Sequence, residues 1–223
     1  PGKPVGLFDA HGGQPNRLYR NNRDGTFTDV AAETGVTGSL LGFPTWFWDC
    51  NNDGQLDLFS ASYAGNTSDV AAQFVGAGQA VELDRLYLGN GHGEFRDVSQ
   101  EFGIDRVSLT MGANFGDLDN DGFDDFYLGT GAPEYDSLVP NIMYHNRYGE
   151  RFEDVTMAGG FGHLQKGHAI AFADFDNDGD QDVFAELGGA YAGDAFANAL
   201  FVNPGFENHW LKVALVGRKS NRS

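Results

Sequence analysis

The chain has 223 residues, of which 32 are acidic and 14 are basic, giving a formal net charge of −18. This charge disfavours nucleic acid and anionic membranes as partners, because both recruit patches of Lys and Arg. A single cysteine excludes an internal disulfide, so bound metal would have to provide the stabilisation that disulfides give many secreted folds. No apolar run approaches the roughly 20 residues that span a bilayer.

In chain order, the sequence predicts one partial repeat unit and three full ones. Residues 1–36 contain "GLFDAHGGQPNRLYRNN", which matches the later strands of a unit but lacks the preceding loop. Full units follow at 37–104, 105–161 and 162–206, with acidic loops at 49–57, 117–125 and 174–182. Residues 207–223, "ENHWLKVALVGRKSNRS", are expected to begin an appended segment. We therefore expect a piece of a larger protein, or one member of an assembly whose partners complete it.

A second phrase before each loop sets the register of the repeat: "NRLYRNNRDGTFTDVAAETGV", "DRLYLGNGHGEFRDVSQEFGI" and "NIMYHNRYGERFEDVTMAGGF". Asp29, Asp97 and Asp154 in these phrases each lie 20 residues before the start of the next loop. Each unit has four short runs rich in aromatic, β-branched or other apolar residues, which predict strands on both sides of the loop and at "RLYL" and "EFRDV" or their equivalents. Repeated four-stranded units predict an all-β fold made of β-propeller blades, each of four antiparallel strands.

The acidic loops share the pattern D-x-[DN]-x-D-G-x-x-D. Carboxylates this close together repel one another unless a cation lies among them. Positions 1, 3 and 5 can direct oxygen atoms to one centre, the glycine at position 6 permits the turn, and the position 7 carbonyl and position 9 carboxylate complete a cage suited to Ca²⁺. The predicted ligands of three Ca²⁺ sites are Asp49, Asn51, Asp53, the carbonyl of Gln55 and Asp57; Asp117, Asp119, Asp121, the carbonyl of Phe123 and Asp125; and Asp174, Asp176, Asp178, the carbonyl of Asp180 and Asp182.

Other interpretations of the loops fit less well. An EF-hand requires a glutamate at position 12 and flanking helices, whereas position 12 is Ser60, Leu128 or Ala185 and the flanks predict strands. An ordinary solvated turn accounts for a single Asp/Asn/Gly run, but poorly for three in matched context. Zinc would need nitrogen or sulfur ligands, which the loops lack.

The phrase F-x-D-V, a glycine before the next strand (Gly35, Gly103 and Gly160) and the acidic loop together resemble the FG-GAP or VCBS repeat of integrin α-subunit propellers. More narrowly, "GHLQKGHAIAFADFDNDGDQDVF" followed by "NHWLKVALVGRKSNR" resembles the ASPIC/UnbV family, which includes the cartilage acidic proteins. The resemblance spans nearly the whole chain. It implies a Ca²⁺-binding propeller, usually of seven blades, with the ASPIC/UnbV segment after it. Only Asn51 departs from aspartate in the loop pattern, and its amide keeps an oxygen ligand.

The first full unit carries two unusual features. Trp46 and Trp48 align with Asn114 and Gly116 in the second unit, and with small alanines in the third. They either fill space between blades or form an aromatic surface that stacks on a sugar ring or a protein side chain. The insertion "YAGNTSDVAAQFVGAGQAVE" in the same unit predicts a contact loop.

The remaining reactive side chains do not indicate catalysis. Cys50, at position 2 of the first loop, predicts a buried or partly buried free thiol. His163 and His168 would face opposite sides of a strand, so we expect a structural role for them rather than a transition-metal pair. No G-x-S-x-G, H-E-x-x-H, C-x-x-C or phosphate-binding loop occurs, and the sequence therefore predicts no enzyme.

Two functional hypotheses remain. The first is a non-catalytic, Ca²⁺-rigidified recognition or assembly module of an extracellular, periplasmic or cell-surface protein, which mediates protein, matrix or surface interactions. The second is the accessory or glycan-binding part of a secreted carbohydrate-active enzyme. Both predict a protein or glycan partner at the propeller surface and further blades from the same or another chain. Neither involves nucleic acid or a transmembrane segment.

Overall fold

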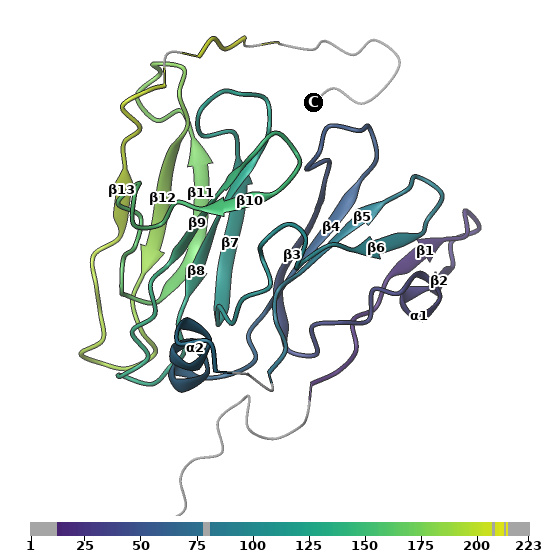
Figure 1. The fold of residues 1–223 in the computed structure, drawn as a ribbon, viewed down its shortest axis with the longest axis horizontal. Helices are drawn as coiled ribbons and strands as arrows, with labels where there is room; N and C mark the ends of the chain where they lie inside the picture. The colour runs from purple at the N-terminus through teal and green to yellow at the C-terminus, as the bar shows by residue number, and fades with distance from the viewer. Residues whose placement is uncertain (1–12, 78–80, 207, 212, 214–223) are drawn as a thin grey trace, which may run out of the picture.

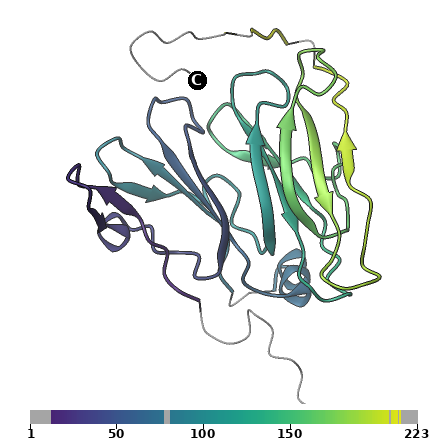
Figure 2. The ribbon, with the colours of Figure 1, turned by 180° about the vertical axis from the view of Figure 1, so that it is seen from behind.

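The computed structural model describes residues 13–77, 81–206, 208–211 and 213, and within these ranges the chain folds into antiparallel sheets of short strands (Figures 1 and 2). The first sheet contains β3 (Gly42–Trp48), β4 (Asp57–Ser62), β5 (Arg85–Gly89) and β6 (Phe95–Asp97). The second contains β7 (Thr110–Gly116), β8 (Asp125–Thr130), β9 (Ile142–Asn146) and β10 (Phe152–Asp154). The third contains β11 (Gly167–Ala173), β12 (Asp182–Leu187) and β13 (Ala199–Phe201).

A hairpin of β1 (Tyr19–Asn21) and β2 (Phe27–Asp29) precedes the first sheet and is followed by the one-turn helix α1 (Ala31–Thr34). The predicted all-β character is confirmed, and strands pair antiparallel in sequence order within every sheet; the predicted four strands are present in the first two sheets, whereas the third has three among the described residues. The predicted ASPIC/UnbV-like segment at 207–223 and the start of the partial unit at 1–12 lie largely outside the described residues. Among the described helices, none is long and apolar enough to cross a membrane.

The repeated aspartate of each phrase F-x-D-V has a local structural role at the end of β2, β6 or β10. The side chains of Asp29, Asp97 and Asp154 each accept a hydrogen bond from the backbone N–H two residues later, at 3.0 to 3.2 Å. Each also pairs with an arginine guanidinium. Such a turn uses the side-chain oxygen to bond a backbone donor that has left the strand ladder. The repeat phrase therefore encodes the exit from the last strand of a sheet.

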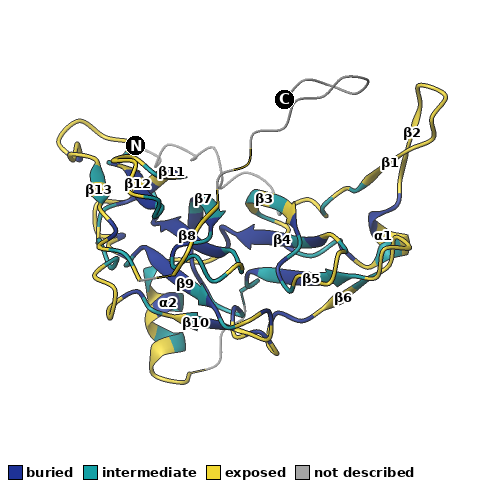
Figure 3. Cartoon of the chain, turned by 90° about the horizontal axis from the view of Figure 1, so that it is seen from above, coloured by how far each residue is buried: buried dark blue, intermediate teal, exposed yellow. Residues whose placement is uncertain are grey.

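The first strands of the three sheets lie side by side, because β7 contacts both β3 and β11. Seen from above, the sheets spread outward from these strands, and the buried residues are concentrated where neighbouring sheets face each other (Figure 3). Each sheet thus buries a face against the next one, as repeated units that cannot form a core alone must do.

An aromatic cluster fills the space between the first and second sheets. Trp48 is 3% exposed and stacks on Phe152 with ring centroids 5.7 Å apart, and both tryptophans contact Phe115 and Phe126 of the second sheet. Trp46 is partly buried against the same cluster. This arrangement agrees with the space-filling interpretation of the two tryptophans, because Trp48 has almost no face left for a ligand.

Between the second and third sheets, glycines allow the backbones to come close together. A Cβ atom on Gly112 would lie 1.6 Å from the carbonyl oxygen of His168, and one on Gly129 would lie 2.8 Å from Gly167. Gly116, which aligns with Trp48, instead leaves room for side chains of the third unit, because a Cβ atom there would lie 2.1 Å from Oε1 of Gln181 and 2.8 Å from the ring of Phe172. The difference between tryptophan in one unit and small residues in the next therefore reflects two kinds of inter-sheet packing.

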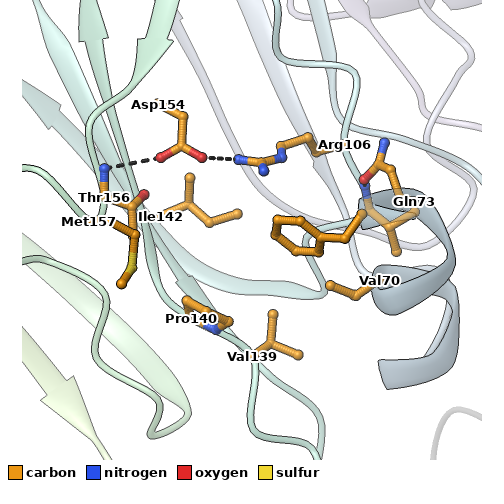
Figure 4. A pocket seen from close by; sticks show the side chains of 11 residues that line it. Val70, Gln73, Arg106, Val139, Pro140, Ile142, Asp154, Thr156 and Met157 are labelled. Carbon is orange, nitrogen blue, oxygen red and sulfur yellow. Dashed lines mark hydrogen bonds and ion pairs between the residues drawn. The ribbon is translucent and has the colours of Figure 1, made fainter. Parts of the chain in front are cut away.

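The insertion in the first unit differs from the predicted contact loop, because part of it forms helix α2 (Thr67–Phe74). Asn66 caps this helix, and its side chain accepts hydrogen bonds from the backbone of Ser68 and Asp69 while Asp69 reciprocates as a capping box. Val70 of the helix packs in a cluster with Val107, Leu109 and Val139, which lie in the segments that lead into β7 and β9. The helix, which belongs to the first unit, thereby contacts the second. It also borders a cavity of about 190 Å³, whose lining includes the ion pair of Arg106 and Asp154 (Figure 4).

Candidate metal centres

All three acidic loops adopt the same turn, which depends on two positions. Position 4 is asparagine with a left-handed backbone in each loop: Asn52, Asn120 and Asn177 have φ of 57°, 56° and 64°. Position 6 is glycine with φ of 83° to 101°. Asparagine and glycine tolerate this region best among the amino acids, so the sequence pattern predicts the turn geometry itself.

In the first and second loops, backbone N–H groups hold the side chains of positions 1, 3 and 5 inside the turn, and in the third loop they hold those of positions 3 and 5. In the second loop, Asp117 accepts from the N–H groups of Asp121 and Gly122 at 3.0 and 2.9 Å, and Asp121 accepts from Phe123 at 2.9 Å. The first loop repeats this pattern at Asp49 and Asp53. These bonds orient the oxygen atoms before any ion binds, which lowers the ordering cost of coordination.

Two loops bring three potential ligand atoms together. In the third loop, carboxylate oxygens of Asp174, Asp176 and Asp178 lie within 4.8 Å of one another. One oxygen of Asp174 is buried without a hydrogen-bond partner in the described structure. A buried, unpaired carboxylate oxygen is costly, and a cation among the three side chains would satisfy it.

In the second loop, the cluster comprises Asp119, Asp121 and His145. Burial, opposed by backbone hydrogen bonds, raises the pKa of Asp117 and Asp121, with repulsion from Asp119 adding to the rise. A bound divalent cation would reverse these shifts, because it stabilises the ionised carboxylates. The residues therefore fit an ion of this charge.

The first loop has a weaker constellation. Asn51 occupies position 3, and its amide donates to a carboxylate oxygen of Asp53 at 3.1 Å. The loop therefore offers a carboxylate, an amide oxygen and a second carboxylate where the third loop offers three carboxylates. Cys50 at position 2 is a buried free thiol, as predicted, and burial raises its pKa far above the usual range.

The position 9 aspartates, Asp57, Asp125 and Asp182, begin the second strand of each sheet and are buried. Each uses one oxygen to accept the N–H of loop position 2 and the other to accept an N–H from the third strand or the residues after it, at 2.7 to 3.0 Å. Burial raises the pKa of Asp125 to about 8. These hydrogen bonds connect the loop to the sheet. Because each oxygen already accepts one hydrogen bond, the predicted coordination of a cation by these aspartates would use the second lone pair of an oxygen.

Neighbouring loops are joined by asparagine side chains that sequence reasoning left without a role. Asn52 donates to the carbonyl of Gly122 at 2.7 Å, and Asn120 donates to the carbonyl of Gly179 at 3.3 Å. Asn146, the last residue of β9, and Asn203, two residues after β13, donate to the carbonyl of loop position 2 in the preceding unit at 2.8 and 2.6 Å. The signal was present, since asparagine occupies position 4 in all three loops.

His145 is the other residue that the sequence reasoning missed. It lies on β9, outside the loop pattern, and reaches the second loop only because β8 and β9 pair. Its Nε2 atom lies 3.0 Å from Oδ2 of Asp119. By contrast, His163 and His168 are held apart from the loops by hydrogen bonds to the backbone N–H of Gln165 and the carbonyl of Gly188.

Repeated antiparallel sheets, each with an acidic turn between its first two strands, define the chain as a β-repeat protein of the FG-GAP type. The FG-GAP-like repeat model matches residues 49–128 and 134–185, which together exceed half of the chain, so the chain belongs to this family. The predicted resemblance is thereby confirmed.

Curated relatives extend the comparison to the cartilage acidic proteins. The chain is 29% identical over 221 residues to cartilage acidic protein 1 of Xenopus tropicalis, covering 93% of this chain and 30% of that protein. The human protein of the same name is 28% identical over 219 residues, covering 93% and 29%. The mouse protein is 26% identical over 170 residues, covering 74% and 24%. The chain thus spans less than a third of the length of these relatives.

Proposed function

We propose that the chain is a Ca²⁺-rigidified recognition or assembly module, in which each sheet is a blade of a β-propeller. The observation that carries the proposal is the repeated loop: carboxylate oxygens of the second and third loops come within 4.8 Å of one another, and asparagines of the first and second loops bond to the next loop. Ions bound in such loops would fix the connection between the first two strands of each blade and couple neighbouring blades. No part of this role requires catalysis.

The outer faces of the first and third sheets expose apolar side chains, which is an argument for further blades on either side. Phe43 and Phe47 of the first sheet are 47% and 46% exposed, and Phe184 and Leu200 of the third are 41% and 43% exposed. The inner faces of the same sheets are packed against the second sheet. We propose that additional FG-GAP-like blades cover these faces, from the same or another chain, with unit boundaries at 36/37, 104/105 and 161/162 and seven blades in the complete ring.

We place the module in an extracellular, periplasmic or cell-surface protein, where millimolar Ca²⁺ suits weak loop sites. Extracellular Ca²⁺ modules commonly have dissociation constants of ~10⁻⁴ to 10⁻³ M. The proposed partner is a protein or matrix component at the propeller surface. The glycan-binding alternative depended on Trp46 and Trp48, and with both indoles packed between sheets no observation favours it.

Removal of Ca²⁺ is expected to lower the melting temperature by several degrees. At 1 mM free Ca²⁺, three sites of the stated affinity would add about 1 to 4 kcal/mol to the free energy of unfolding. The measurement is thermal unfolding in 1 mM Ca²⁺ and in excess EGTA, with metal analysis to verify that the ions have left. An unchanged melting curve in the metal-free sample would contradict the proposal.

The three loops should also differ in affinity. The 49–57 site has three carboxylates at side-chain ligand positions, whereas the other two have four, and affinity rises with ligand charge. The 49–57 site should therefore be the first to lose its ion as free Ca²⁺ is lowered, and site-resolved NMR at each Ca²⁺ concentration measures the order. Asn51→Asp should tighten the 49–57 site, and Asp176→Asn in the third loop is the matched control that should weaken its own site. If the 49–57 site empties last, rigidity from the adjacent aromatic cluster outweighs charge.

A further inference from the structure

The second acidic loop differs from the other two in the residue that faces it from the third strand. Tyr144 pairs with Phe126, so the next residue, His145, comes beside Asp125 at the end of the loop. The same register places Leu88 beside Asp57 and Val202 beside Asp182 in the other two sheets. A histidine therefore approaches one loop, and aliphatic side chains approach the others.

The imidazole is directed into the carboxylate cluster. Its Nε2 atom lies 3.0 Å from Oδ2 of Asp119 and 4.0 Å from Oδ1 of Asp125. The side chains of His145 and Asp119 are only 16% and 17% exposed. Donor atoms of Asp119, Asp121 and His145 all lie within 4.8 Å of one another. One nitrogen and two carboxylate oxygens thus surround a common point.

The chemistry of this donor set differs from that of an all-oxygen loop. Ca²⁺ prefers six to eight oxygen ligands, whereas imidazole nitrogen is a ligand that suits Zn²⁺, Cu²⁺, Fe²⁺ and Ni²⁺. Zinc sites in proteins use histidine nitrogen and aspartate or glutamate oxygen as ligands, so each of these three side chains is a donor that Zn²⁺ accepts. The acidic loop itself has no nitrogen or sulfur ligand for zinc, and His145 supplies a nitrogen from the neighbouring strand.

Space for further ligands lies beside the cluster. A cavity of about 340 Å³ is bordered by Asp119, Asp125 and His145 on one side and by Met143 and Phe161 on the other. It provides an entry path and room for water at the remaining coordination positions. Arg147 also borders the cavity, but its guanidinium pairs with Glu153 at 2.6 Å, which offsets its charge.

We propose that Asp119, Asp121 and His145 form a mixed nitrogen and oxygen site at which a divalent first-row transition ion, for example Zn²⁺, displaces the Ca²⁺ that the second loop binds in its absence, while the loops at 49–57 and 174–182 bind Ca²⁺ alone. This inference rests on the proposed metal-binding role of the loops. It makes the second loop a specificity-determining position within otherwise equivalent repeats.

The test is calorimetric titration of the 223-residue chain with Zn²⁺ in the presence of saturating Ca²⁺. The wild-type chain should bind one Zn²⁺ at this site, and His145→Leu, which installs the residue of the first unit, should weaken that binding by at least about tenfold. Loss of a direct ligand should cost at least as much as the 10- to 100-fold loss seen on removing an outer-shell partner. His145→Gln provides a second variant of similar size, and near-ultraviolet circular dichroism verifies that each variant is folded.

Val202→His is the matched gain-of-site control. Val202 is 57% exposed, so the substitution should leave the fold intact and create a second Zn²⁺ site at the third loop. Equal Zn²⁺ binding by the wild-type chain, His145→Leu and His145→Gln would overturn the inference, because adventitious binding to the five other histidines is unchanged in these variants. A separate Ca²⁺ titration of His145→Leu distinguishes this result from failure of the loops to bind metal at all.

Discussion

Lys166→Met is expected to lower the free energy of unfolding by about 3 to 5 kcal/mol, because it leaves a buried carboxylate without its partner. Lys166 and Asp194 have side chains only 1% and 6% exposed, and Nζ of the lysine lies 2.8 Å from Oδ2 of the aspartate. Lys166 comes just before β11, while Asp194 belongs to the connection between β12 and β13. Chemical denaturation of the wild type and the variant in the same Ca²⁺ concentration measures the difference.

The double variant Lys166→Met/Asp194→Asn separates the buried charge from the packing. It removes both charges, so it should lose less stability than Lys166→Met alone. Arg96→Met is the exposed counterpart: Arg96 and Glu101 pair at 2.7 Å but are 61% and 60% exposed, and the loss should stay below about 1 kcal/mol. A loss of similar size for Lys166→Met and Arg96→Met would show that the buried pair is not a determinant of stability.

The fold followed from the sequence wherever the signal was local and repeated. Short runs of aromatic, β-branched and other apolar residues, together with the fixed spacing from Asp29, Asp97 and Asp154 to the loops, predicted the strands and their order. The helix α2 was missed although its capping box, Asn66 to Asp69, is visible in the sequence. Its stability depends on the packing of Val70 against Val107 and Leu109, which lie outside the insertion. Such non-local burial is not encoded in a short window.

The candidate metal centres show the same division between local and non-local information. The turn at positions 4 and 6 is set by asparagine and glycine within nine residues, so the loop pattern predicts it. The contact of His145 with Asp119 depends on the register between β8 and β9, across 26 residues of chain. A shift of one residue would turn the imidazole to the opposite face of the sheet. Pairing of strands was predictable here, whereas register required the structure.

Asp84→Asn is expected to stabilise the protein at pH 8 and to have little effect at pH 4. Asp84 is fully buried, and burial raises its pKa from 3.8 to about 7, although hydrogen bonds from Ser62 and Ser108 and the nearby Arg106 guanidinium oppose the rise. One carboxylate oxygen accepts from the Ser62 N–H at 2.7 Å and from the Ser108 hydroxyl at 2.9 Å, while the other has no hydrogen-bond partner in the described structure.

The other units hold asparagine at this position, which explains why the amide should fit. Asn141 accepts the N–H of Thr130 with its oxygen, as Asp84 accepts that of Ser62, and its amide group donates to the carbonyl of Gln165. Asn16 and Asn198 align with it in the remaining copies. An amide can thus replace the carboxylate oxygen that lacks a partner without introducing a charge.

The sign of the pH dependence follows from the two pKa values. Between pH 4 and 7 the folded chain retains a proton on Asp84 that the unfolded chain has released, so this group lowers the free energy of unfolding as pH rises and its effect is complete above pH 7. A shift of about three pKa units corresponds to an upper bound of about 4 kcal/mol. Urea denaturation of the wild type and Asp84→Asn from pH 4 to 8 should therefore give a stability difference that widens with pH. Contributions from the acidic loops cancel in this difference, because they are common to both proteins.

Asp84→Leu is the control for shape: it should destabilise the protein at every pH, since it leaves the donors of Ser62 and Ser108 unpaired. A difference between wild type and Asp84→Asn that stays constant from pH 4 to 8 would mean that ionisation of Asp84 does not contribute to stability.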